Sequence, residues 1–181
     1  MARETTESLL DQGYQARREH RPEDAQCLFE TAVLKCRRRE RHPLLARSLI
    51  GLGQIERDLG NLDTALDCYG QAVQILRTLN DPPALAHTIR HVGDIQRNRR
   101  EFDQAAPCYV EALEIYRANE FTPPLDLANT LRGYALLKGE LGSGEEAKLL
   151  WAEAGQLYQA VGVQAGVDEC ARQIALLGTD R

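Results

Sequence analysis

A triplet of small, aromatic and small residues occurs four times in the 181-residue chain at nearly constant spacing. In the second copy, Ala65 and Ala72 flank Tyr69. A period of 20–50 residues is the signature of an array of stacked structural repeats. The other three copies are Ala25, Phe29 and Ala32; Ala105, Tyr109 and Ala112; and Ala147, Trp151 and Ala154.

Each copy of the triplet belongs to a predicted pair of helices. The stretch Ser48–Leu79 reads as two helices separated by a break at Gly60 and Asn61. In both helices apolar residues recur every three or four positions, which places them on one helical face. Short helices are marginal in water by themselves, so these faces must be buried against neighbours. The other copies supply those neighbours.

Small residues also recur on the first helix of each pair. Gly13, Gly53 and Gly93 are 40 residues apart, and Ala135 takes this position in the fourth copy. A glycine inside a helix costs about 1 kcal/mol relative to alanine, so its repetition indicates a close approach between helices. We therefore expect the aromatic ring of each triplet to be buried against the first helix of its own pair.

The periodicity predicts an all-α protein that forms a single domain over residues 1–181. A further amphipathic stretch after Gly162 predicts a last helix with one polar side, as the end of a repeat array requires. The predicted boundaries are about 5–40, 43–80, 83–120 and 123–161 for the four repeats and 163–178 for the capping helix.

Composition excludes several classes of function. The net charge of -5 argues against a nucleic-acid partner, which usually selects a basic excess. The basic stretch Lys35–His42 could form a nucleic-acid patch, but Glu40 interrupts it and we interpret it as a solvated helix end. We find no apolar run near 18 residues and no secretory signal, so we predict no membrane association. The five cysteines are an odd number without a CxxC pair, which favours a reducing cytoplasm.

Motifs for catalysis are absent from the sequence. It has no GxSxG, no phosphate-binding loop and no HExxH, so we predict that the chain is not an enzyme and needs no cofactor. His87 and His91 are four residues apart and could share a metal ion. No third ligand stands at a suitable spacing, so we predict no metal site and interpret the two histidines as groove-wall or surface residues.

The repeated residues resemble the tetratricopeptide repeat family over about residues 8–161. Gly53, Ala65, Tyr69 and Ala72 match the small, small, aromatic and small positions of that family, and the other copies match likewise. The 40-residue period is similar to that of the long-helix, kinesin-light-chain-like branch. The resemblance implies an α-solenoid, a right-handed superhelix of helix–turn–helix repeats. Its concave groove, lined by the first helices, would receive peptides.

The resemblance also implies which residues line that groove. Arg17, Arg57 and Arg97 are 40 residues apart and occupy one position in three successive repeats. Arginine favours bidentate recognition of carboxylates, so the groove could bind an acidic segment. Alternatively, Arg57 and Arg97 pair with nearby acids such as Asp58 and Asp94 and stabilise the stack. By position the groove wall consists of Leu10, Tyr14, Arg17, Arg47, Ile50, Gln54, Arg57, His87, Arg90, Asp94, Arg97, Arg132 and Leu136.

The sequence therefore predicts a non-catalytic module that binds a protein or peptide partner in its concave groove. Two alternatives stay open. The chain could be a scaffold that self-associates through a terminal repeat; we predict a monomer or a weak homodimer. It could also be a small regulatory sensor whose superhelix tightens around a ligand.

Overall fold

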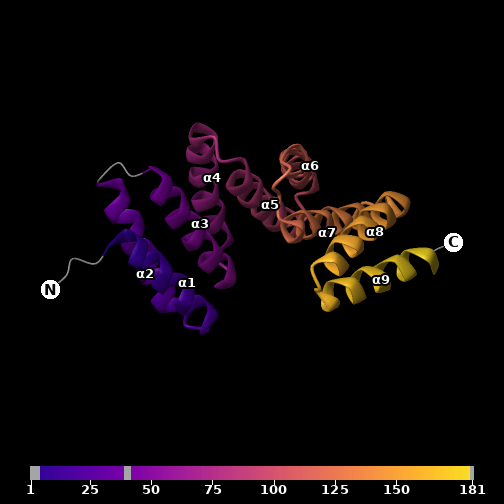
Figure 1. Cartoon of the computed structure of the whole chain (residues 1–181), viewed down its shortest axis with the longest axis horizontal. Helices are drawn as coiled ribbons and strands as arrows, with labels where there is room; N and C mark the ends of the chain where they lie inside the picture. The colour runs from indigo at the N-terminus through magenta and orange to yellow at the C-terminus, as the bar shows by residue number, and fades with distance from the viewer. Residues whose placement is uncertain (1–4, 39–41, 180–181) are drawn as a thin grey trace. The chain divides into compact units, whose positions relative to one another are not determined.

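The structure, a computed structural model, describes residues 5–38 and 42–179. Residues 39–41, which include the end of the first predicted repeat and part of the basic stretch, lie outside this description. All regular secondary structure in the described residues is α-helical (Figure 1). The helices are α1 (Thr6–Arg18), α2 (Pro22–Arg37), α3 (His42–Asp58), α4 (Leu62–Leu79), α5 (Pro82–Asn98), α6 (Phe102–Ala118), α7 (Pro124–Glu140), α8 (Gly144–Ala160) and α9 (Gln164–Thr179).

The turn inside each helix pair has the same backbone conformation. A left-handed residue follows the first helix at His20, Gly60, Arg100 and Gly142, with φ between 57° and 84°. The next residue donates its N–H to a carbonyl five residues back, as Arg21 does to Ala16 at 2.9 Å and Asn61 to Glu56 at 2.8 Å. This is the Schellman arrangement, which satisfies carbonyls at a helix end. Two of the four turns accept a residue other than glycine at the left-handed position.

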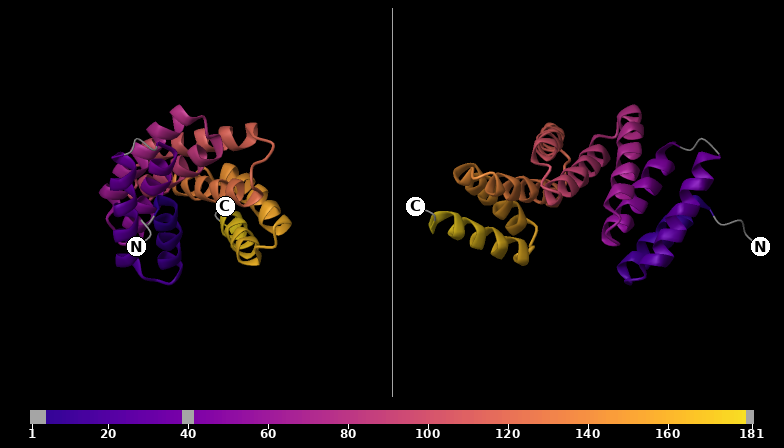
Figure 2. Two further views of the ribbon diagram at one scale, coloured as in Figure 1. Left: turned by 60° about the vertical axis from the view of Figure 1, so that its left-hand side comes forward. Right: turned by 180° about the vertical axis from the view of Figure 1, so that it is seen from behind.

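The helices form two compact units, residues 1–81 and 82–181. In unit 1, α1 packs against α2, α3 against α4, and α2 and α1 against α3. In unit 2, α5 packs against α6, α7 against α8, and α6 and α5 against α7. The views in Figure 2 show α3 and α4 of unit 1, and α8 and α9 of unit 2, side by side. The single domain predicted from the sequence stays a prediction.

Each aromatic ring of the repeated triplet is buried, as the sequence predicts. Phe29, Tyr69 and Tyr109 are 0% exposed and Trp151 is 1% exposed. The glycines of the first helices make room for these rings. A Cβ atom added at Gly13 would lie 2.9 Å from the ring of Phe29, and one added at Gly53 would lie 2.8 Å from that of Tyr69.

A second set of glycines faces the aromatic ring of the preceding repeat, a contact that the sequence pattern did not predict. Gly51 on α3 lies against Phe29, and Gly133 on α7 lies against Tyr109. A Cβ atom at Gly133 would lie 2.7 Å from Cε1 of Tyr109. Each of these rings therefore fills a space bounded by small residues from two successive repeats, which joins the repeats inside one unit.

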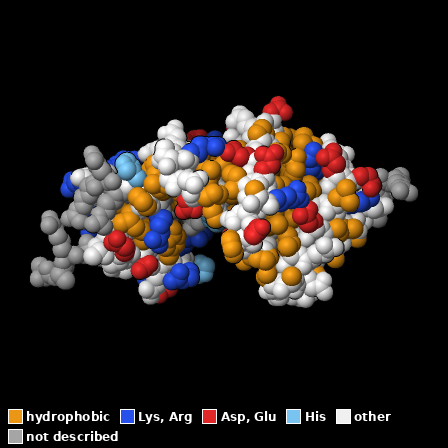
Figure 3. All heavy atoms as spheres, turned by 45° about the horizontal axis from the view of Figure 1, so that its top comes forward, with side chains coloured by type: hydrophobic (Ala, Val, Ile, Leu, Met, Phe, Trp, Pro, Cys, Tyr) orange, Lys and Arg blue, Asp and Glu red, His pale blue; other side chains and the backbone are white. Residues whose placement is uncertain are grey.

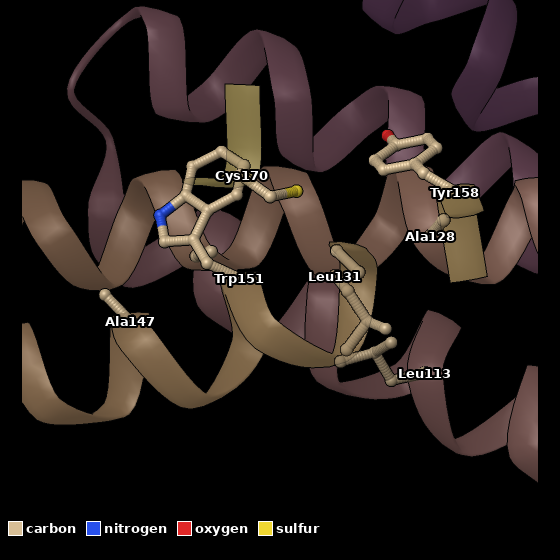
Figure 4. Close-up of a cluster of buried hydrophobic side chains, with 9 residues drawn as sticks. Leu113, Ala128, Leu131, Ala147, Trp151, Tyr158 and Cys170 are labelled. Atoms are coloured by element: carbon tan, nitrogen blue, oxygen red, sulfur yellow. The ribbon is translucent and has the colours of Figure 1, made fainter. Parts of the chain in front are cut away.

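The last helix covers the end of unit 2. Cys170 of α9 is 2% exposed and belongs to the same buried cluster as Trp151, Leu131 and Tyr158 (Figure 4). Helix α9 packs against α8, and a Cβ atom added at Gly155 of α8 would lie 3.3 Å from Cβ of Cys170. The capping helix predicted from the sequence is thereby confirmed.

The substitution Gly133→Ala should lower the free energy of unfolding by about 1–3 kcal/mol, because the added methyl group displaces Tyr109. The cost of displacing the ring should be larger than the gain of about 1 kcal/mol in helix stability that alanine has over glycine. Urea denaturation at neutral pH measures both effects.

Gly139 in the same helix is the matched control, since a Cβ atom added there meets nothing within 4 Å. Gly139→Ala should leave stability unchanged or raise it by up to about 1 kcal/mol. Equal effects of the two substitutions would contradict the proposed packing of Tyr109.

Candidate functional site

The predicted groove residues of unit 1 lie on α1 and α3, and two of their arginines share one carboxylate. Arg17 Nε donates to Asp58 Oδ2 at 2.8 Å, and Arg57 Nη2 donates to Asp58 Oδ1 at 3.1 Å. Arg17 also donates to Gln54 Oε1 at 3.3 Å. Burial acts to raise the pKa of Asp58, but the hydrogen bonds from Arg17 and Arg57 hold it below its usual value. Asp58 is therefore ionised at neutral pH.

Tyr14 and Arg47 complete this face. The Tyr14 ring packs edge-on against Phe29 with 5.0 Å between ring centroids. Burial raises the pKa of Tyr14, and the positive charges of Arg47 and Arg17 partly oppose that rise. Arg47 is exposed and makes no hydrogen bond or ion pair in the described part of the chain. Acidic residues on α1, Glu7 and Asp11, lie nearer its start.

Two predicted groove arginines of unit 2, Arg97 and Arg132, each bond to a separate glutamate. Arg97 Nη1 donates to Glu140 Oε1 at 3.0 Å, which joins α5 to α7. Arg132 donates two hydrogen bonds of 2.7 Å to Glu169, which joins α7 to α9. The hydrogen bonds from Arg132 lower the pKa of Glu169 although burial opposes them. These contacts support the stack-stabilising interpretation for unit 2.

The expected pairing of Arg97 with Asp94 is wrong. Asp94 instead accepts from Arg90 Nη1 at 2.8 Å and from the Tyr109 hydroxyl at 2.8 Å. Arg90 lies one turn before Asp94 on α5, whereas Arg97 is directed toward Glu140 on the next first helix. Asp94 therefore fixes the buried ring of Tyr109, and this contact helps to raise the pKa of that phenol beyond the effect of burial.

The two histidines predicted at the groove wall or surface have different environments. His91 is 6% exposed, so a surface position is wrong for it, whereas His87 is half-buried. Their Nε2 atoms lie 3.2 Å apart, and Arg90 Nη2 lies 3.1 Å from Nε2 of His91. His87 Nδ1 lies 3.9 Å from Asp126 Oδ1. The described residues contain no group of three or more potential ligands arranged for a metal ion.

Three apolar residues predicted on the groove wall instead face the protein interior. Leu10 is 0% exposed and Ile50 is 8% exposed, and Leu136 packs against the buried cluster of unit 2. The sequence pattern gives the direction in which a side chain points from its own helix. A neighbouring repeat buries some side chains that would be exposed on a single hairpin. Leu59, by contrast, is 38% exposed because it follows the end of α3.

Sequence reasoning also missed an open pocket at the C-terminal ends of α1 and α3. Its volume is about 260 Å³. The sequence signal that could have found it is His20, which occupies the left-handed turn position held by Gly60 and Gly142 in other repeats. The pocket is lined by Arg17, His20, Pro22, Asp58 and Leu59.

The sequence matches the family model described as Tetratricopeptide repeat over residues 4–78 and 55–118. The chain belongs to the tetratricopeptide repeat family. A search of curated proteins finds no match. Among the described residues, no helix of this tetratricopeptide repeat protein is both long enough and apolar enough to cross a membrane.

Solved structures share the fold at low sequence identity. BtubC (BKLC) from P. vanneervenii is 18% identical with a TM-score of 0.72, over 97% of this chain and 82% of that one. The apo form of RapI is 15% identical with a TM-score of 0.85, over 97% of this chain and 63% of RapI. A Podosopora anserina putative kinesin light chain with nearly identical TPR-like repeats is 16% identical with a TM-score of 0.70, and the match covers 100% of both chains. These matches confirm the all-α solenoid fold and the likeness to kinesin-light-chain-like repeats.

Proposed function

We propose that this chain is a non-catalytic interaction module that binds an acidic segment of a partner protein on the α1–α3 face of unit 1. Tetratricopeptide repeat proteins generally mediate protein–protein interactions, and the family match supports this class of function. The acidic character of the partner is the part of the proposal that rests on this chain's own residues. A cytoplasmic location belongs to the same proposal and is supported by the five free cysteines.

One observation carries the proposal: Arg17 and Arg57 share the single carboxylate of Asp58. Two guanidinium groups held side by side on one carboxylate form a cationic cluster, which suits recognition of a partner's carboxylate. The face is only partly buried, with 33% of the Arg17 side chain and 25% of the Arg57 side chain exposed. A guanidinium has five N–H groups, so Arg17, which donates to Asp58 and Gln54, retains others that could donate to a partner's carboxylate.

Arg47 and Tyr14 extend this face along α3 and α1. Arg47 offers an exposed cation, and the phenol of Tyr14 offers a hydroxyl group beside it. In unit 2, the predicted groove arginines Arg97 and Arg132 each bond to a separate glutamate. The charge pattern therefore favours unit 1 as the site for an acidic segment.

The substitution Arg47→Glu should weaken the binding of an acidic peptide about fivefold, because it replaces an attractive charge by a repulsive one at an exposed position. A suitable probe is a fluorescein-labelled twelve-residue peptide of alternating glutamate and serine, measured by fluorescence anisotropy at about 50 mM salt. Raising the salt to about 500 mM should weaken binding to the unsubstituted chain, since screening shortens the range of the attraction.

Arg172→Glu on α9 is the control, because it makes the same change of charge at an exposed position of unit 2. It should leave the affinity nearly unchanged. An equal loss for both variants would show that only the net charge matters and would contradict a binding face on α1 and α3.

Self-association through the terminal repeat is a second candidate function. Leu149 on α8 is 73% exposed and Leu176 on α9 is 61% exposed. Figure 3 shows apolar side chains on the surface of unit 2, interspersed with acidic and basic ones. Apolar surface exposed in this way would be buried if two copies paired through it.

If copies pair through this repeat, light scattering should show a mass that rises with concentration from 20.3 kDa toward twice that value. The double substitution Leu149→Ser and Leu176→Ser should then hold the chain at the monomer mass. A constant mass of 20.3 kDa up to about 500 µM for the unsubstituted chain would exclude this candidate.

A further inference from the structure

Two histidines of α5 bring their Nε2 atoms together. His87 and His91 are four residues apart, so their side chains project from the same face of the helix. The two Nε2 atoms are 3.2 Å apart. A zinc ion lies about 2.0–2.1 Å from an imidazole nitrogen, so one ion bonded to both atoms at this separation would subtend an angle of about 100–106°. This angle is close to that of a tetrahedral ion, so the pair has the spacing of two ligands of one metal.

The other nitrogen of each ring faces a carboxylate. His91 Nδ1 lies 3.7 Å from Asp94 Oδ2, and His87 Nδ1 lies 3.9 Å from Asp126 Oδ1 on α7. Histidines that bind metals commonly have a carboxylate beside the second ring nitrogen, because it fixes the tautomer and makes the ligating nitrogen more basic. All four residues belong to unit 2. The surroundings of the pair are therefore those of metal ligands.

Arg90 indicates which nitrogen of His91 carries the ring proton. Its Nη2 atom lies 3.1 Å from His91 Nε2, and its Nη1 atom donates to Asp94 Oδ2 at 2.8 Å. A guanidinium can only donate, so His91 Nε2 accepts and the proton is on Nδ1, beside Asp94. A metal ion requires the same unprotonated Nε2 atom. Arg90 therefore holds a positive charge at the place that an ion would take.

Arg90 can give way to an ion by a local movement of its side chain. Its Nε atom is buried and has no hydrogen-bond partner among the described residues, so the present position leaves one donor unsatisfied. An ion would displace the Nη2 atom from His91, whereas Nη1 can remain on Asp94. The side chain of His87 is 33% exposed, compared with 8% for His91. The ion can thus enter from solvent past His87.

The repeat fold itself does not require this histidine pair. The equivalent positions carry Arg47 and Gly51 in the second repeat and Asn129 and Gly133 in the fourth. A buried polar side chain such as the imidazole of His91 lowers stability unless its polar atoms are satisfied. A bound ion would satisfy the Nε2 atoms of both rings.

We propose that His87 and His91 bind one divalent transition-metal ion through their Nε2 atoms. The proposal replaces the expectation, drawn from the sequence alone, of no metal site, because the sequence shows the spacing of the pair but not the facing carboxylates. Nitrogen ligands favour zinc, nickel or copper over magnesium or calcium. The site belongs to unit 2 and does not depend on the acidic-segment face of unit 1.

The proposed site is open to a further ligand. No group of three or more His, Cys, Asp or Glu residues is arranged for an ion in the described ranges 5–38 and 42–179. Two protein nitrogens leave two positions of a tetrahedral ion for water or for an atom of a partner, as in sites where zinc exchanges ligands. Binding should raise the melting temperature, since the ion stabilises the folded state.

Isothermal titration of the full chain, without a histidine tag, with Zn²⁺ tests the proposal. We expect one ion per chain and no binding of Mg²⁺. His87→Gln removes a ligand and should weaken Zn²⁺ binding by about tenfold or more, and Asp126→Asn should weaken it about tenfold. His42→Gln is the control, because His42 is an exposed histidine at the start of α3, and it should leave the affinity unchanged.

Arg90→Met should have the opposite effect. It removes the competing positive charge and should tighten Zn²⁺ binding about fivefold. A role of the histidines in packing alone predicts no such gain. In the chain loaded with Cu²⁺, pulsed electron paramagnetic resonance should detect two coordinated imidazoles, and only one in His87→Gln.

Two results would overturn the proposal. One is the absence of binding at millimolar Zn²⁺. The other is an affinity that is the same in His87→Gln and in the unsubstituted chain, which would show that the ion binds elsewhere. Circular dichroism checks that each variant remains helical. If His87→Gln fails to fold, Asp126→Asn and Arg90→Met decide, since unchanged affinity in both would contradict the site. None of these results bears on the binding of acidic peptides to unit 1.

Discussion

The structure depends on one packing interaction, an aromatic ring held between glycines of two successive first helices. Phe29 shows it fully, with Gly13 on one side and Gly51 on the other. Neither glycine position can carry a methyl group without moving the ring. Because protein interiors are close-packed, the ring fixes the distance between consecutive helices and their axial positions. The repeat length must then stay nearly constant, and the sequence keeps a period of 40 to 42 residues.

The fixed axial position of each first helix determines which charged side chains of neighbouring repeats meet. Residues near the end of one first helix lie beside those of the next, so Arg17 meets Asp58 and Arg97 meets Glu140. These pairs join first helices within a unit and involve two of the six arginines at the predicted groove. Exposed pairs of this kind contribute about 0–1 kcal/mol each, so they orient the helices more than they stabilise the fold.

The fold could be predicted from the sequence because its determinants are periodic. The Tyr69 triplet and the glycines of the first helices gave the helices, the turns and the buried rings. The candidate site was less predictable, since it depends on contacts between repeats. Arginine and glutamate side chains reach several ångströms, and a one-dimensional pattern does not show that Arg97 turns to Glu140 rather than to Asp94. The burial of Leu10 and His91 likewise follows from neighbouring helices that no single hairpin shows.

The proposed binding face on α1 and α3 is tested most directly by Gln54→Glu, which adds a carboxylate where Gln54 accepts a hydrogen bond from Arg17. The new carboxylate would compete with an acidic partner for Arg17. Isothermal titration of an acidic peptide, with thermal unfolding recorded in parallel, measures both consequences. We predict an affinity several-fold weaker and a melting temperature that is unchanged or higher. An unchanged affinity in a folded variant would contradict the assignment of this face as the binding site.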